Sequence, residues 1–120
     1  MPISVLVVGY GSIGKRHLEI LKKFNFVNNV AVLTGQKNLP YNTLSNLEDS
    51  INLNPDYIVI ASSTSLHLKQ LIFFEEKMKN KTILIEKPVF EKFHDLIIRN
   101  NKVFVGYNLR FHPLIQLLKK

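Results

Sequence analysis

The chain of 120 residues has room for one domain with one hydrophobic core, and its 46% hydrophobic and 21% charged residues exclude an intrinsically disordered protein. No apolar run approaches the roughly 20 residues of a membrane helix or resembles a signal peptide, so we expect a cytoplasmic protein without membrane association. The net charge of +7 comes from dispersed lysines and arginines, which favours a solvated surface over a nucleic-acid-binding face.

In chain order, apolar runs alternate with polar, helix-like stretches, as in a parallel sheet with helical crossovers. The first run, Ile3 to Val8, is almost wholly apolar, as a strand buried on both faces should be. A helix is predicted after it from Ile13 to Phe24, with Ile13, Leu18 and Leu21 on its inner side. Further strands are predicted at Asn29–Leu33, Pro40–Asn42, Tyr57–Ala61, Thr82–Glu86 and Lys102–Gly106, and further helices between Ser45 and Pro55, at Thr64–Lys79, at Val89–Asn100 and from Pro113.

The connection from Thr34 to Leu39 is too short and too polar for a crossover helix, so the chain should loop directly into the third strand. The expected architecture is a single doubly wound α/β domain over residues 1–120, a three-layer parallel sheet of about six strands in the order 3-2-1-4-5-6.

A glycine-rich turn follows the first strand and opens the first helix. Its residues Gly9, Gly11 and Gly14 match the G-x-G-x-x-G pattern, in which the glycines make the tight turn, admit a pyrophosphate and allow close helix packing. The helix N-terminus adds N–H donors for the phosphates. The pattern predicts a Rossmann fold that binds a dinucleotide; the alternative is a glycine-rich turn that binds nothing.

The end of the second strand is where NAD enzymes usually place a carboxylate against the ribose hydroxyls. Here the position is Thr34, followed three residues later by Lys37, and no carboxylate is present. Thr34 can bond a ribose or a 2′-phosphate and Lys37 can neutralise that phosphate, so NADP is slightly favoured over NAD. The alternative is that this loop is simply polar surface.

Two further polar stretches follow strand ends. Ser62, Ser63 and Thr64 come after the strand that begins at Tyr57, at the edge where ligands bind in open α/β sheets, although they can also be helix caps. Lys87, between Glu86 and Pro88, can hydrogen-bond a substrate hydroxyl or help move its proton; the alternative is an exposed lysine beside a helix-starting proline.

Four stretches together resemble the glucose–fructose oxidoreductase / inositol dehydrogenase / MocA family, and span nearly the whole chain but only the N-terminal half of a typical member. They are Val8–His17, Ser62–His67, Glu86–Pro88 and Val105–Pro113. The resemblance implies hydride transfer at a secondary alcohol of a sugar, sugar nucleotide or cyclitol, and a role in bacterial surface-sugar biosynthesis.

The resemblance also implies roles for individual residues. Lys87 would lie by nicotinamide and substrate, and His17 would be structural. Other positions would line the cofactor site or its crevice: Gly9, Ser12, Ile13, Ser62, Thr64, His67, Glu86, Pro88, Asn108 and Arg110.

The substrate-binding second domain of the family is absent from these 120 residues. We therefore expect part of an enzyme, a compact domain that works with a partner subunit or a second copy, a non-catalytic dinucleotide-binding module, or a truncated inactive remnant of an enzyme. An apolar stripe near the C-terminus suits such a partner, and the alternative is that it packs on the domain's own sheet; its residues are Leu114, Ile115, Leu117 and Leu118. With no cysteine, and no ligand spacing among histidines and carboxylates, no metal site is expected.

Overall fold

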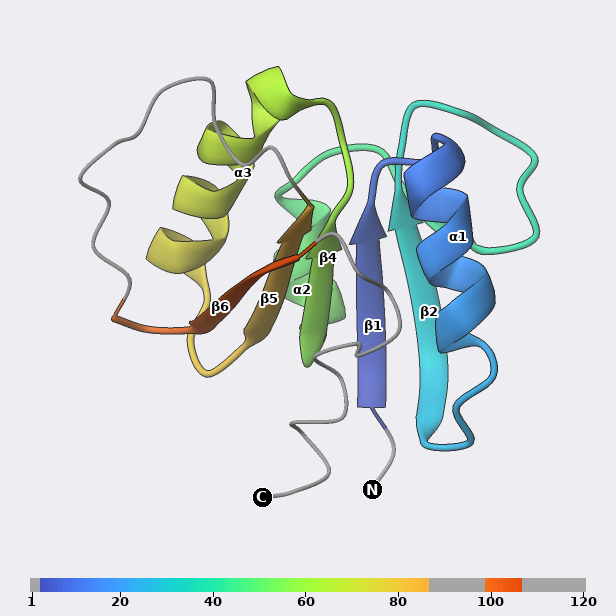
Figure 1. Cartoon of the computed structure of the whole chain (residues 1–120), viewed down its shortest axis with the longest axis horizontal. Coiled ribbons are helices and arrows are strands. Elements are labelled where there is room, and N and C mark those ends of the chain that lie inside the picture. Colours follow the sequence, from blue (N-terminus) through green and yellow to red (C-terminus); the bar gives the residue numbers. More distant parts are fainter. Residues whose placement is uncertain (1–2, 87–98, 107–120) are drawn as a thin grey trace.

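A computed structural model of the chain describes residues 3–86 and 99–106, excepting the side chains of Thr64, Glu86 and Val105. Within these ranges six parallel strands form one sheet in the order β3-β2-β1-β4-β5-β6, which confirms the predicted Rossmann topology (Figure 1). The elements are β1 (Ile3–Val8), α1 (Ser12–Leu21), β2 (Val27–Leu33), β3 (Asn42–Leu44), α2 (Asp49–Leu53), β4 (Tyr57–Ile60), α3 (Thr64–Lys77), β5 (Thr82–Glu86) and β6 (Lys102–Gly106).

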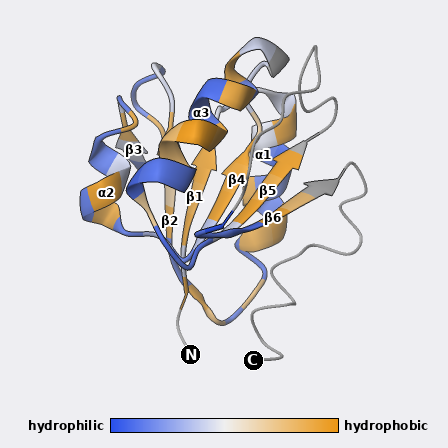
Figure 2. Ribbon diagram, turned by 90° about the vertical axis from the view of Figure 1, so that its left-hand side faces the viewer, coloured by the Kyte–Doolittle hydropathy of each residue, from blue (hydrophilic) through white to orange (hydrophobic). Residues whose placement is uncertain are grey.

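The alternation of side chains along the central strands divides the core into two layers. On β1, Val5 and Val7 face α1 and pack with Leu18 and Leu21, whereas Leu6 faces the other side, where α2 and α3 lie. Each of these strand residues is fully buried. Figure 2 shows the result as hydrophobic central strands, flanked by helices in which hydrophobic and hydrophilic residues alternate.

The inner face of α1 differs from the predicted one. Gly14, His17, Leu18 and Leu21 are its buried residues, whereas Ile13 is 41% exposed. The buried positions follow the i, i+3, i+4, i+7 spacing of one helix face, and Ile13 lies at its margin in the first turn. The prediction that Ile13 packs inward was therefore wrong.

Several predicted boundaries also shift. Helix α1 ends at Leu21 rather than Phe24, and β3 begins at Asn42, where the predicted strand ended. The absence of a helix between β2 and β3 is confirmed for residues 34–41. The short helix α2 ends before Pro55 as expected, and Asn46 helps to start it because its Oδ1 accepts the Asp49 N–H at 3.1 Å. The predicted helix from Pro113 lies outside the described residues, and so does the predicted helix over 89–100 up to residue 98. Residues 99 and 100 are described and are not helical.

A buried carboxylate joins the end of α3 to the entrance of β6. Glu75, only 7% exposed, accepts the backbone N–H groups of Arg99 and Asn100 at 2.8 and 2.9 Å on Oε2, and the Asn101 side-chain amide at 3.0 Å on Oε1. Burial by itself raises the pKa of Glu75, but these hydrogen bonds outweigh it and hold the pKa below 4.5. The ionised carboxylate therefore stabilises this corner of the fold.

Loss of the Glu75 charge should lower stability at acid pH. Because the folded-state pKa lies below the unfolded value, the stabilisation is present above about pH 4.5 and is lost as the pH falls through the folded-state pKa. At pH 7, Glu75→Gln should reduce the free energy of unfolding by about 1–3 kcal/mol, because one acceptor is replaced by a donor facing N–H groups. Urea denaturation at pH 7 and pH 3 measures both effects.

The matched control is Glu76→Gln, since Glu76 is the exposed neighbour in the same helix. It should leave the free energy of unfolding within about 0.5 kcal/mol of wild type. Equal effects of the two substitutions would contradict a role for the buried carboxylate.

Candidate cofactor site

Two of the three glycines in the turn after β1 are required by close backbone packing. Gly9 has φ +103°, and a Cβ there would lie 3.0 Å from the carbonyl oxygen of Ala61 and from the backbone of Ser62. A Cβ on Gly14 would lie only 2.2 Å from the carbonyl oxygen of Gly9. These glycines therefore let the β1–α1 turn, the first turn of α1 and the β4–α3 turn meet at the carboxyl edge of the sheet.

Gly11 differs from the other two because a Cβ on it would meet nothing within 4 Å. Its φ of −84° suits any residue, so neither strain nor packing in the described structure explains a glycine here. Gly11 is the N-cap of α1, and the first N–H groups of a helix have no acceptor within that helix. An open backbone beside free donors fits the approach of a pyrophosphate.

The loop after β2 is tied to the glycine turn. The Thr34 N–H donates to the Leu44 carbonyl at 3.0 Å, and the Thr34 Oγ1 accepts the Gln36 N–H at 3.2 Å. The Gln36 side-chain amide then donates to the Tyr10 carbonyl at 3.2 Å. Residues 34–37 are thus held next to the turn, and the exposed Lys37 adds a positive charge there.

The turn after β4 is held by two hydrogen bonds to α3. Ser62 Oγ donates to Gln70 Oε1 at 2.5 Å, and His67 Nε2 donates to the Ser62 carbonyl at 2.8 Å. His67 is only 2% exposed, so its hydrogen bond to the turn is shielded from water. Ser63 is the N-cap of α3, as the alternative interpretation expected, although its side chain makes no capping hydrogen bond.

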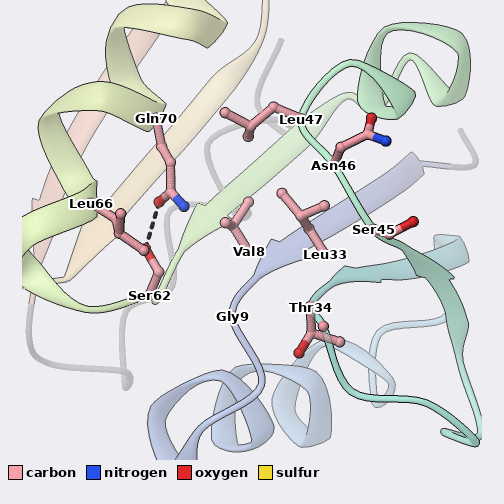
Figure 3. A pocket seen from close by; sticks show the side chains of 11 residues that line it. Val8, Gly9, Leu33, Thr34, Ser45, Asn46, Leu47, Ser62, Leu66 and Gln70 are labelled. Atoms are coloured by element: carbon pink, nitrogen blue, oxygen red, sulfur yellow. Dashed lines mark hydrogen bonds between the residues drawn. The ribbon is translucent and has the colours of Figure 1, made fainter.

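A cavity of about 360 Å³ lies where these three segments meet (Figure 3). It opens beyond the carboxyl ends of β2, β1 and β4. Strands β2 and β3 lie on one side of β1 and strands β4 to β6 on the other, and ligands of open α/β sheets bind where the strand order switches sides in this way. Its walls combine apolar and polar side chains, as those of small-molecule pockets do. The lining residues are Val8, Gly9, Leu33, Thr34, Gly35, Ser45, Asn46, Leu47, Ser62, Leu66 and Gln70.

Three predicted site residues, Gly9, Thr34 and Ser62, line this cavity together. The predicted residues Gly11, Ser12, Ile13 and Gly14 form the adjoining start of α1, and Lys37, Ser63 and His67 lie on the loop and helix beside the cavity without lining it. The side chains of Thr64 and Glu86, and the whole of Lys87, Pro88, Asn108 and Arg110, lie outside the described residues.

Gln70 and the segment Ser45–Leu47 line the cavity but were not predicted. The spacing of Gln70 from the apolar Phe74, four residues later, is the signal that places it on the buried face of α3, although it does not give the direction of its amide. Among the described residues, no cluster of three or more histidine, aspartate or glutamate side chains could hold a metal ion. None of the three described helices has the length and apolar character that crossing a membrane requires.

Fold and site together define a dinucleotide-binding Rossmann domain. The chain matches, over residues 3–98, the family model described as "Oxidoreductase family, NAD-binding Rossmann fold". It therefore belongs to the glucose–fructose oxidoreductase / inositol dehydrogenase / MocA family, as its motifs indicated. Comparison with curated protein sequences gives no match.

Solved structures similar to the chain include myo-inositol 2-dehydrogenase from Lactobacillus plantarum, with 26% identity, a TM-score of 0.66 and coverage of 78% of this chain and 30% of that one. Scyllo-inositol dehydrogenase from Lactobacillus casei, with bound NAD(H) and scyllo-inositol, has 21% identity, a TM-score of 0.61 and coverage of 75% and 29%. The WlbA dehydrogenase from Bordetella pertussis, in complex with NADH and UDP-GlcNAcA, has 21% identity, a TM-score of 0.64 and coverage of 76% of this chain and 30% of that one. The chain thus spans less than a third of the length of these proteins.

The three glycines should respond differently to alanine. Gly14→Ala should lower the free energy of unfolding by at least about 2 kcal/mol, because its Cβ meets a backbone oxygen that cannot move cheaply. Gly11→Ala should change it by less than about 1 kcal/mol, because its Cβ points into open space. Urea denaturation measures both, and equal losses would refute the packing described for this turn.

Proposed function

We propose that this chain is the cofactor-binding domain of an oxidoreductase that oxidises or reduces a secondary alcohol of a sugar, sugar nucleotide or cyclitol. The observation that carries the proposal is the open backbone at Gly11, next to helix N–H donors and to a cavity at the carboxyl edge of the sheet. The inositol and UDP-GlcNAcA ligands named for the two similar dehydrogenases support the substrate class.

In this proposal the start of α1, at Gly11, Ser12 and Ile13, binds the pyrophosphate through backbone N–H groups. The adenosine half occupies the cavity between Thr34 and Ser62. When bound, the nicotinamide ring supplies the site that accepts or donates hydride. Lys87, with Asn108 and Arg110, is proposed from the family resemblance to hold the substrate hydroxyl and its proton.

The loop after β2 favours NADP within this family of NAD-binding domains. A 2′-phosphate needs donors and positive charge, and residues 34–41 supply Thr34, Gln36 and Lys37 without a carboxylate to repel it. Gln36 holds the loop on the glycine turn, so these groups are already in place before a ligand binds.

Turnover would require substrate-binding residues beyond those of a cofactor domain. We propose that they come from a further domain, a second copy or a partner subunit, in a cytoplasmic enzyme of bacterial surface-sugar biosynthesis. The direct assay for this chain is consequently the binding of a dinucleotide, and activity is measured only with that complement present.

Calorimetric titration with NADPH and NADH should give dissociation constants in about the micromolar range. Gly11→Val should abolish binding of both, because a side chain there occupies the space proposed for the pyrophosphate, while the thermal midpoint stays close to that of wild type. Absence of binding by the wild-type chain would refute the proposal, and full binding by Gly11→Val would refute this placement of the phosphates.

The preference for NADPH should depend on Lys37. Lys37→Gln should weaken NADPH binding about tenfold and leave NADH binding unchanged, because only NADPH presents a phosphate to that charge. Lys23→Gln is the control, since Lys23 is an exposed lysine beyond the far end of α1 and changes the net charge equally. Equal losses for the two variants would indicate a general electrostatic effect, and tighter binding of NADH by wild type would contradict the NADP preference.

A further inference from the structure

Gln70 is a buried polar side chain that faces the cavity. It lies in the second turn of α3 and is only 8% exposed, yet it lines the cavity together with Val8 and Leu47. Figure 3 shows its amide nitrogen on the side of Val8, while the amide oxygen points toward Ser62. A primary-amide nitrogen that opens onto a cavity is a hydrogen-bond donor that a ligand can meet.

The orientation of this amide is set by Ser62. The Ser62 hydroxyl donates to Gln70 Oε1 at 2.5 Å, which commits the oxygen and leaves the NH₂ group as the part that faces the cavity. Ser62 is itself held from the other side, because its carbonyl accepts His67 Nε2 at 2.8 Å. The site is therefore preset to meet a hydrogen-bond acceptor.

The chemistry of the walls indicates which acceptor this is. Val8, Leu33, Leu47 and Leu66 form the apolar part of the cavity wall. A phosphate oxygen in such surroundings would be an uncompensated charge, because none of the described lysines or arginines lines the cavity. An uncharged aromatic ring with a ring-nitrogen acceptor at its edge satisfies both the apolar walls and the amide.

We propose that Gln70 donates a hydrogen bond to N1 of the adenine base and thereby selects adenine over hypoxanthine, with Ser62 as the positioning residue. This inference rests on the proposed function, in which the adenosine half occupies the cavity between Thr34 and Ser62, with its ribose at Thr34. A purine is joined to its ribose through N9, so the edge that reaches farthest into the cavity is the one that carries N1. In hypoxanthine N1 bears a hydrogen, so two donors would face each other.

The test compares binding of NADH with that of reduced nicotinamide hypoxanthine dinucleotide by calorimetry, which needs no turnover. The wild-type chain should bind the adenine form about tenfold more tightly, the effect expected of one lost hydrogen bond with a buried group. Gln70→Leu should weaken binding of the adenine form and remove the preference, with its fold checked by circular dichroism. Lys69→Gln, at the exposed neighbouring position, is the control and should keep the preference.

Ser62→Ala supplies a second, independent readout. Without the Ser62 hydroxyl the Gln70 amide can turn either its nitrogen or its oxygen to the base, so NADH should still bind while the preference for adenine shrinks. Equal binding of the two dinucleotides by wild type, or a preference that survives in Gln70→Leu, would overturn the inference and leave the proposed function standing. Binding of neither by wild type would overturn the proposed function and this inference with it.

Discussion

The structure depends on the close approach of backbone segments at the carboxyl edge of the sheet. Gly14 brings the first turn of α1 against the carbonyl of Gly9, and Gly9 in turn lies against the backbone of Ala61 and Ser62. Side chains at either glycine would force these segments apart. The same approach leaves the N-terminus of α1 facing outward with its N–H donors, so the packing that closes the core also builds the candidate phosphate site.

The polar interactions at that edge are organised around the same contact. Gln36 ties the helix-free loop after β2 to the Tyr10 carbonyl, and Ser62 ties the turn after β4 to Gln70. The second of these hydrogen bonds joins two residues that line the cavity. At the other edge of the sheet, Glu75 serves stability instead, by closing α3 onto the segment before β6. The candidate binding site and the Glu75 hydrogen bonds thus lie at opposite edges of the sheet.

Much of the fold follows directly from the sequence. Apolar runs such as Ile3–Val8 and Tyr57–Ile60 are buried on both faces, and their spacing around a G-x-G-x-x-G turn is sufficient to predict the parallel sheet and its order. Ile13 was misplaced because periodicity identifies a helix face but does not say which residues at the margin of that face are covered. The start of β3 was misplaced because a three-residue edge strand carries almost no pattern of its own.

The candidate site was predictable only in part. The glycines, Thr34 and Ser62 were found because each directly follows a strand, and strand ends share one edge in a parallel sheet. Gln70 was missed because its role depends on a partner eight residues away and on the direction of its amide, which no local pattern encodes. The segment from Ser45 was predicted only as the start of a short helix, since its place at the cavity depends on how the loop before α2 folds over the sheet.

Dinucleotide binding at the carboxyl edge of the sheet is detected most directly by an amide chemical-shift map, recorded while NADPH is titrated into the ¹⁵N-labelled chain. We expect shifts at Gly9–Gly14, Thr34–Lys37 and Ser62–Gln70. A smaller cavity of about 220 Å³ at the opposite edge, lined by Lys81, Arg99 and Lys102 among others, is the competing place for an anion. Shifts confined to that edge, or no shifts at saturating NADPH, would contradict the account.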